Sequence, residues 1–159
     1  MNNKLVWIDG ETKAALFLKG KGYKIIDKNC KIGGSEIDII AILPKKQQKI
    51  NLLSEFKQNK RIGKFSSNDD LKFYKRVLSN NIRELRDILV FVEVKARFSK
   101  KYGYPYEAVD EQKQHNLERG CIAYIKKYKK ENIGARIDVV SVIDNEIVHI
   151  ENAFDIKMY

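Results

Sequence analysis

Hydrophobic positions along the chain alternate between helical and strand-like spacing. A helical pattern covers residues 9–22, with Asp9 at the N-cap position and two glycines at its end. The later segments, in chain order, are strands at 23–32, 35–43 and 88–97, a helix at 109–130 and strands at 135–143 and 146–154. This order predicts a single α/β domain with a mixed central sheet flanked by helices.

Charged residues interrupt the third predicted strand, "ILVFVEVKAR" (88–97). With a period of two, Glu93, Lys95 and Arg97 share a face with Leu89 and Phe91. Ionised groups in a core cost several kcal/mol each unless they are paired, hydrogen-bonded or bound to metal. The E-x-K triplet alone is better explained as an exposed ion pair, but its continuously apolar flanks disfavour an exposed strand face.

The second predicted strand, "SEIDIIAIL" (35–43), also contains inward acids. The period of two places Glu36 and Asp38 on the face of Ile40, with Ile37 and Ile39 on the other. If the two strands form a hairpin, Asp38 lies beside Glu93. Two such carboxylates suit Mg²⁺ or Mn²⁺, and a cation removes their mutual repulsion. For Glu36, solvation at the strand end explains the residue better than a supporting role.

Two charged residues face inward from the predicted helices. Glu11 shares a helical face with Ala14 and Leu18, although a first-turn acid that complements the helix dipole is the simpler explanation. In the second long helix Asp110 is the expected N-cap, and the buried stripe from Leu117 to Tyr128 leads back to Lys113. Lys113 either meets a phosphate or covers core with its stem, and the pattern leaves both open.

The charge is uneven along the chain, which has 31 basic and 21 acidic residues and a formal charge of +10. Residues 45–87 hold 12 basic and 5 acidic residues, so most of the excess lies there. A polyanionic partner and a solvated lysine-rich surface explain this equally well. We interpret 45–87 as an insertion between two core strands, with an unstructured first half and an amphipathic helix in the second.

Other features exclude several classes. Cys30 and Cys121 have no motif spacing and the histidines lie far from both, which argues against a zinc site or a disulfide framework. The first helix carries charges throughout, so no signal peptide is expected, and no apolar run approaches the ~20 residues of a membrane span. A cytoplasmic protein without membrane segments is the expectation. His149 and Asp138 are better explained as structural residues than as catalytic ones.

A combination of segments adds a family resemblance. "GETKAALFLKGKGYKIIDKN", "SEIDIIA", "LVFVEVKAR", "EAVDEQKQ", "ARIDVVSV" and "VHIENAF" follow one another as in the YraN-type uncharacterised proteins of bacteria. That family is similar to the restriction-endonuclease-like PD-(D/E)xK nucleases, especially the archaeal Holliday-junction resolvases. The resemblance covers residues 8–43 and 88–154. The chain departs from it at Ser35, where the family usually has glycine, and in the insertion.

The resemblance implies a restriction-endonuclease-like mixed sheet of about four strands and Mg²⁺- or Mn²⁺-dependent cutting of DNA, on branched or single-strand-containing substrates. A homodimer is implied by the resolvases. The alternative is a non-catalytic nucleic-acid-binding protein that keeps the fold. By position the resemblance assigns Asp38, Glu93 and Lys95 to the catalytic core, Glu11 to the metal site, and Lys113 and Arg97 to contacts with nucleic acid.

The insertion leaves three alternatives open. Its lysines add contacts to the nucleic-acid backbone, it is an inert acquired segment, or it binds a partner protein. The sequence slightly favours the inert segment. A long surface loop costs little closure entropy, so an insertion here is compatible with pairing of the two strands.

Overall fold

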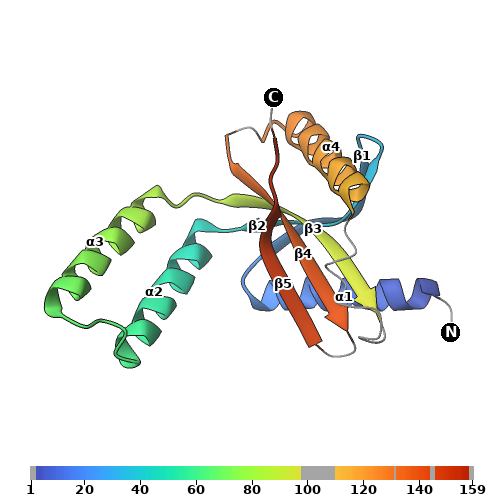
Figure 1. Ribbon diagram of the computed structural model, residues 1–159. Helices are drawn as coiled ribbons and strands as arrows, with labels where there is room; N and C mark the ends of the chain where they lie inside the picture. Colours follow the sequence, from blue (N-terminus) through green and yellow to red (C-terminus); the bar gives the residue numbers. More distant parts are fainter. Residues whose placement is uncertain (1–2, 98–109, 131, 144–145, 158–159) are drawn as a thin grey trace.

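The computed structural model describes residues 3–97, 110–130, 132–143 and 146–157. Five strands form one sheet in the order of the chain (Figure 1). The strands are β1 (Lys24–Ile32), β2 (Ser35–Leu43), β3 (Ile88–Arg97), β4 (Gly134–Ile143) and β5 (Glu146–Phe154). The helices are α1 (Asn3–Gly20), α2 (Lys45–Arg61), α3 (Asn68–Glu84) and α4 (Glu111–Lys127).

The sheet is mixed because of one crossover. β1, β2 and β3 pair antiparallel, as do β4 and β5, whereas β3 and β4 pair parallel, with α4 in the connection between them. The α/β class with a mixed central sheet is confirmed, and the arrangement is that expected of a restriction-endonuclease-like core.

Each face of the sheet is covered by one helix (Figure 1). On the α1 face, Ala14 and Leu18 pack against alternating valines of β3 and β4. On the α4 face, Leu117 and Cys121 pack against Phe91 and its neighbours. The sheet is therefore apolar on both sides, which leaves a charged side chain in its strands few places to reach water.

The alternation along β2 breaks at Asp38. Ile39 packs on the α1 face and Ile40 on the α4 face, as expected, but Ile37 also packs on the α4 face. The expectation that Ile37 and Ile39 share a face is therefore wrong. The paired residues of β2 and β3 end at Ile39 and Val92, so β2 is free to change its orientation at Asp38.

The first helix begins earlier than its sequence suggests. α1 starts at Asn3, so Asp9 is not its N-cap and Glu11 is not in its first turn. The helix-dipole explanation of Glu11 is therefore wrong. α1 also approaches β3 closely, because a Cβ built at Gly10 would lie 2.4 Å from the Ala96 Cβ. The helix ends at Gly20, as expected.

The second face contains a similar close approach. The Asp110 side chain accepts a hydrogen bond from the Lys113 N–H at 2.7 Å, which confirms it as the N-cap of α4. A Cβ at Gly120 would lie 3.0 Å from that of Ser35, so the serine at the start of β2 fits because its neighbour on α4 is glycine. Tyr128 is 45% exposed, and its assignment to the buried stripe is wrong.

Residues between β2 and β3 form a helical hairpin that projects from the sheet (Figure 1). The expectation that the first half of 45–87 lacks structure is wrong, because α2 occupies it. We call α2, α3 and the turn between them the arm, residues 45–84. Within the part of the chain that the structure describes, no helix has the length and hydrophobicity to span a membrane.

Candidate active site

Glu93 is a buried carboxylate held between two lysines. It lies on β3 with its side chain 3% exposed. Lys95, two residues along the same strand, places its ammonium 2.8 Å from Oε1. Lys113, from the first turn of α4, places its ammonium 3.0 Å from Oε2. The arrangement is thus no exposed ion pair on a strand surface, and Lys113 points at a carboxylate rather than only covering the core.

Asp38 lies where β2 and β3 part. The β2–β3 pairing ends at Ile39 and Val92. Asp38, just before Ile39, and Glu93, just after Val92, lie directly beyond this last pair. The Asp38 Oδ2 accepts a hydrogen bond from the Val94 backbone N–H at 2.7 Å, so the side chain satisfies a donor next to the end of the strand pairing. The predicted neighbourhood of Asp38 and Glu93 is therefore present.

The charges around Asp38 show how tightly the site is assembled. Burial, and next the negative charge of Glu93, raise the pKa of Asp38 from 3.8 to about 7. The Val94 N–H and the Lys113 ammonium oppose this rise, and Glu11 adds the smallest contribution to it. Glu93, Lys113 and Glu11 thus all act on Asp38, and Glu11 acts most weakly.

Of the three predicted metal-binding acids, Asp38 and Glu93 lie close together and Glu11 lies farther from them. In the described ranges no three His, Cys, Asp or Glu side chains are arranged to hold one metal ion. Asp38 and Glu93 are neighbours, whereas Glu11 reaches the site from α1 only as a weaker electrostatic neighbour. Mg²⁺ is commonly bound by one or two carboxylates and completes its shell with water, so the pair is enough for it.

The Glu93 Oε2 atom is a suitable ligand for a divalent cation. Glu93 Oε2 is buried and accepts no hydrogen bond from the described residues, although the Lys113 ammonium lies within ion-pair distance. A buried carboxylate oxygen that accepts no hydrogen bond retains a lone pair for a further ligand, although the Lys113 ammonium offsets its charge. Glu93 and Asp38 are the residues that would hold a divalent cation, and its charge would lower the pKa of Asp38.

Two further predicted residues have simpler outcomes. The side chain of Arg97 lies outside the described residues, so its assignment to nucleic acid stays a prediction. Glu36 is exposed and lies 3.9 Å from the Lys31 ammonium at the end of β2. It therefore belongs to the solvated strand end, as expected, and not to the site around Asp38.

Sequence reasoning missed Ser141. In the parallel pairing of β3 and β4, Ser141 is the direct neighbour of Lys95, and both side chains project from the same face. Ser141 is 1% exposed, and its hydroxyl has no hydrogen-bond partner in the described part of the chain. The only signal in the sequence is a serine inside an apolar strand, which does not reveal which strand lies alongside.

Comparison with known proteins identifies the family. The model of the uncharacterised protein family UPF0102 matches residues 10–142. The chain belongs to the UPF0102 family. A UPF0102 protein of Caldicellulosiruptor saccharolyticus is 33% identical over 162 residues, covering 97% of this chain and all of that relative. A UPF0102 protein of Trichlorobacter lovleyi is 30% identical over 159 residues, covering 97% of this chain and 93% of the relative.

The UPF0102 match includes the whole candidate site. Its span, residues 10–142, contains Glu11, Asp38, Glu93 and both lysines that contact Glu93. The family identified from the sequence segments is therefore confirmed. The names of these relatives state no activity, so the chemistry of the UPF0102 site must be argued from its own geometry.

A second ionic cluster in this UPF0102 chain stabilises the α1 face of the sheet, opposite the face of Glu93. Asp138 is completely buried, and its carboxylate contacts Arg136 Nε at 3.0 Å, His149 Nε2 at 2.8 Å and the Asn152 N–H at 3.0 Å. Lys21 joins the cluster from the end of α1, 2.9 Å from His149 Nδ1. Both oxygens of Asp138 are engaged, which agrees with the prediction that Asp138 and His149 are structural residues.

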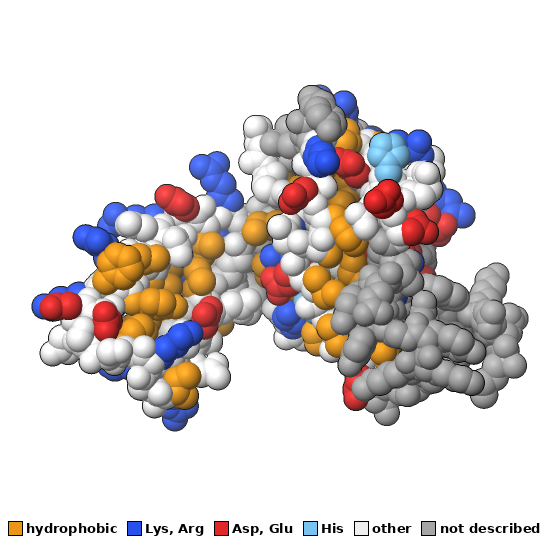
Figure 2. Space-filling view, viewed as in Figure 1, with side chains coloured by type: hydrophobic (Ala, Val, Ile, Leu, Met, Phe, Trp, Pro, Cys, Tyr) orange, Lys and Arg blue, Asp and Glu red, His pale blue; other side chains and the backbone are white. Residues whose placement is uncertain are grey.

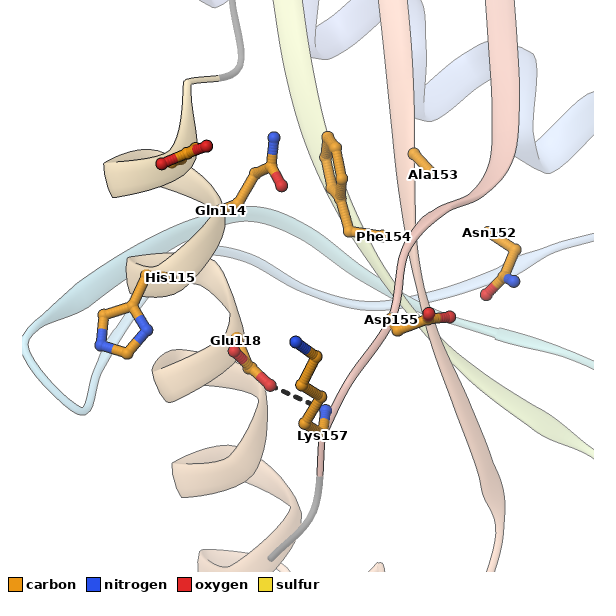
Figure 3. A pocket seen from close by; sticks show the side chains of 9 residues that line it. Gln114, His115, Glu118, Asn152, Ala153, Phe154, Asp155 and Lys157 are labelled. Atoms are coloured by element: carbon orange, nitrogen blue, oxygen red, sulfur yellow. Dashed lines mark hydrogen bonds between the residues drawn. The ribbon is translucent and has the colours of Figure 1, made fainter.

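A polar concavity on this UPF0102 chain is distinct from the site. It lies between α4 and the chain after β5, has a volume of about 460 Å³ and is drawn in Figure 3. Glu118 reaches across it, and its Oε1 accepts a hydrogen bond from the Lys157 N–H at 2.7 Å. Glu111 and Asp155 add further negative charge, which disfavours a phosphate ligand. The concavity contains none of the predicted site residues.

Proposed function

We propose that this protein hydrolyses phosphodiester bonds in DNA with Mg²⁺ or Mn²⁺ held by Asp38 and Glu93. The observation that carries the proposal is the pair of carboxylates at the point where β2 and β3 separate, with Glu93 buried, Asp38 half-buried and the pKa of Asp38 raised to about 7. Two acids in this position do not stabilise the fold by packing, because burial and mutual repulsion both make their ionised forms unfavourable. The resemblance to PD-(D/E)xK nucleases supports the same assignment.

The residues around the pair have separate roles in this proposal. The cation supplies electrophilic charge at the scissile phosphate and makes water more acidic. Lys95 is 17% exposed and lies next to Glu93, so it orients the attacking water by donating a hydrogen bond. Lys113 is 33% exposed and neutralises a phosphate oxygen once it leaves Glu93. Glu11 acts through water, which agrees with its weak influence on Asp38.

A cleavage assay tests the proposal. Linear, flapped, single-stranded and four-way DNA are incubated with Mg²⁺ or Mn²⁺ and the wild-type protein, Asp38→Asn or Glu93→Gln. We expect wild-type cutting that EDTA stops and that each substitution reduces by at least 100-fold, with a preference for branched or single-strand-containing DNA. Glu36→Gln is the matched control, because Glu36 is an exposed acid two residues from Asp38 on β2. Normal cutting by both Asp38→Asn and Glu93→Gln contradicts the assignment.

A second candidate is a nucleic-acid-binding protein without catalysis. The observation in its favour is that both oxygens of Glu93 already have an ammonium within 3.0 Å. A carboxylate that is neutralised in this way needs no metal. Titration calorimetry distinguishes the two: Mg²⁺ binding that Glu93→Gln abolishes supports the nuclease, whereas DNA binding without any heat from Mg²⁺ or Mn²⁺ supports the second candidate.

A further inference from the structure

The positive charge of the arm is concentrated on α2. This helix contains six basic residues and one acidic residue, whereas α3 contains four basic and three acidic residues. This difference argues against a surface that is lysine-rich throughout, because such a surface would give both helices a similar charge. α2 therefore contributes a net +5 to a chain whose formal charge is +10.

Three of the six cations of α2 lie on its outer face, the side of the helix that faces away from α3. The helix turns its Leu52, Phe56 and Asn59 stripe toward α3, at a spacing of four and three residues. The opposite stripe contains Lys46, Ile50, Lys57 and Arg61. All four side chains are exposed. In Figure 2 the arm shows hydrophobic side chains along its middle, with Lys and Arg and several Asp and Glu side chains at its margins.

The arm is a folded element with a tip of its own. Phe56, Phe65 and Tyr74 pack together there, with ring centroids 5.1 to 5.9 Å apart. Leu78 of α3 is buried between the helices. A segment that only separated two strands would need neither the aromatic cluster nor two helices of 17 residues each. The hypothesis of an inert segment therefore leaves the internal packing of the arm unexplained.

The base of the arm is fixed to the sheet. The Lys45 backbone N–H donates to Asp87 Oδ1 at 2.8 Å, and Gln48 Nε2 donates to the backbone oxygens of Leu43 and Arg86 at 3.2 and 2.6 Å. These bonds connect the last residue of β2 with the segment before β3. The direction of α2 is thereby coupled to the two strands that hold Asp38 and Glu93.

We propose that the outer face of α2 binds the phosphate backbone of the nucleic acid outside the candidate active site. A helix of 17 residues is about 25 Å long, which corresponds to about seven base pairs of a duplex. Lysines along that length release counterions from a polyanion and fix its direction relative to the sheet. The inference deepens the proposed function, because it rests on nucleic acid as the partner, but it does not require cleavage.

The test compares two variants of equal charge. The arm variant is Lys46→Gln/Lys57→Gln/Arg61→Gln, and the control is Lys126→Gln/Lys127→Gln/Lys129→Gln at the end of α4; all six side chains are exposed. Each variant lowers the formal charge of +10 by three. Binding to a fluorescent 24-base-pair duplex is measured by anisotropy in EDTA, from 50 to 200 mM KCl, and circular dichroism checks that both variants are folded.

We expect the arm variant to bind at least tenfold more weakly than wild type at 100 mM KCl, and the control to bind within threefold of it. The slope of log K against log salt should fall by about 2 to 3 for the arm variant, since each lost phosphate contact contributes about 0.9. Equal weakening by both variants, or no weakening by the arm variant, overturns the inference. Arm-dependent binding to phosphatidylserine vesicles in place of DNA also overturns it.

The outcomes separate this inference from the proposed function. Arm-dependent binding without any cleavage leaves the inference standing and removes the nuclease. If the arm variant cleaves DNA and also binds it with wild-type affinity, the inference is wrong and the proposed nuclease activity stands. No binding of wild type to any nucleic acid removes both.

Discussion

The ammonium of Lys113 lies 3.0 Å from Glu93 Oε2, although the first residue belongs to α4 and the second to β3. The contact joins the start of the crossover helix to the strand that precedes it. It also replaces water around a carboxylate that is 3% exposed. The positions of α4 and of the Glu93 side chain therefore depend on each other.

Removing the Lys113 ammonium should destabilise the metal-free protein. In Lys113→Met, Glu93 retains only Lys95, and an undercompensated buried charge costs about 1–3 kcal/mol. Urea unfolding in EDTA measures the loss, and Mg²⁺ should reduce it if a cation takes the place of the ammonium. Lys126→Met, at an exposed position on the same helix, is the control. Equal stability of the two variants would show that the contact contributes nothing.

The raised pKa of Asp38 predicts an unusual dependence of stability on pH. The folded state holds the Asp38 proton more tightly than the unfolded state, whose carboxyl has a pKa near 3.8. The favourable contribution is therefore complete below pH 4 and is lost as the pH rises to about 7. Asp38→Asn should remove this loss, so in EDTA its melting temperature relative to wild type should increase between pH 5 and pH 8. A constant difference across that range would contradict the raised pKa.

The position of Glu11 should depend on the close packing of the neighbouring Gly10 of α1 against Ala96 of β3. A methyl group at Gly10 collides with Ala96, so Gly10→Ala should cost about 1–3 kcal/mol and weaken binding of Mg²⁺. Unfolding by urea and calorimetry with Mg²⁺ measure the two effects.

Two variants control this test. Gly20→Ala on the same helix should be neutral, because a methyl group there contacts nothing within 4 Å. Adding Ala96→Gly to Gly10→Ala should restore stability, since it removes the atom that collides. Failure of that second change to restore stability would mean that the collision is not the cause.

The buried cluster around Asp138 should affect stability without affecting chemistry. Asp138→Ala leaves Arg136 and His149 without their shared partner, which we expect to cost about 3–5 kcal/mol. Asp155→Ala, at an exposed position, should cost little. Thermal unfolding gives the difference. If DNA cleavage by folded Asp138→Ala fell as far as that of Glu93→Gln, the cluster would belong to the active site.

The sequence predicted the parts of the fold that depend on local periodicity. β2 and β3 begin and end where the period of two indicated, and the neighbourhood of Asp38 and Glu93 followed from pairing them as a hairpin. α2 was missed because its inward stripe includes the polar residue Asn59, which is buried and leaves only a weak helical signal.

Other features depend on contacts between distant segments. The position of Ile37 on the α4 face results from the end of the β2–β3 pairing, which alternation along one strand does not encode. The contact of Lys113 with Glu93 depends on how a long side chain crosses from helix to strand. Ser141 is next to Lys95 only because β3 and β4 pair in parallel through the crossover.

The arm also affects how the chain reaches its folded state. β2 and β3 are adjacent in the sheet although residues 44–87 separate them. Replacing a four-residue turn by a flexible connection of that length slows the meeting of the strands and costs about 2 kcal/mol in closure entropy. Helices form within about a microsecond, so α2 and α3 have time to fold first and bring Leu43 close to Ile88. We therefore expect the arm to act as a local nucleus for pairing the two strands that hold the carboxylates.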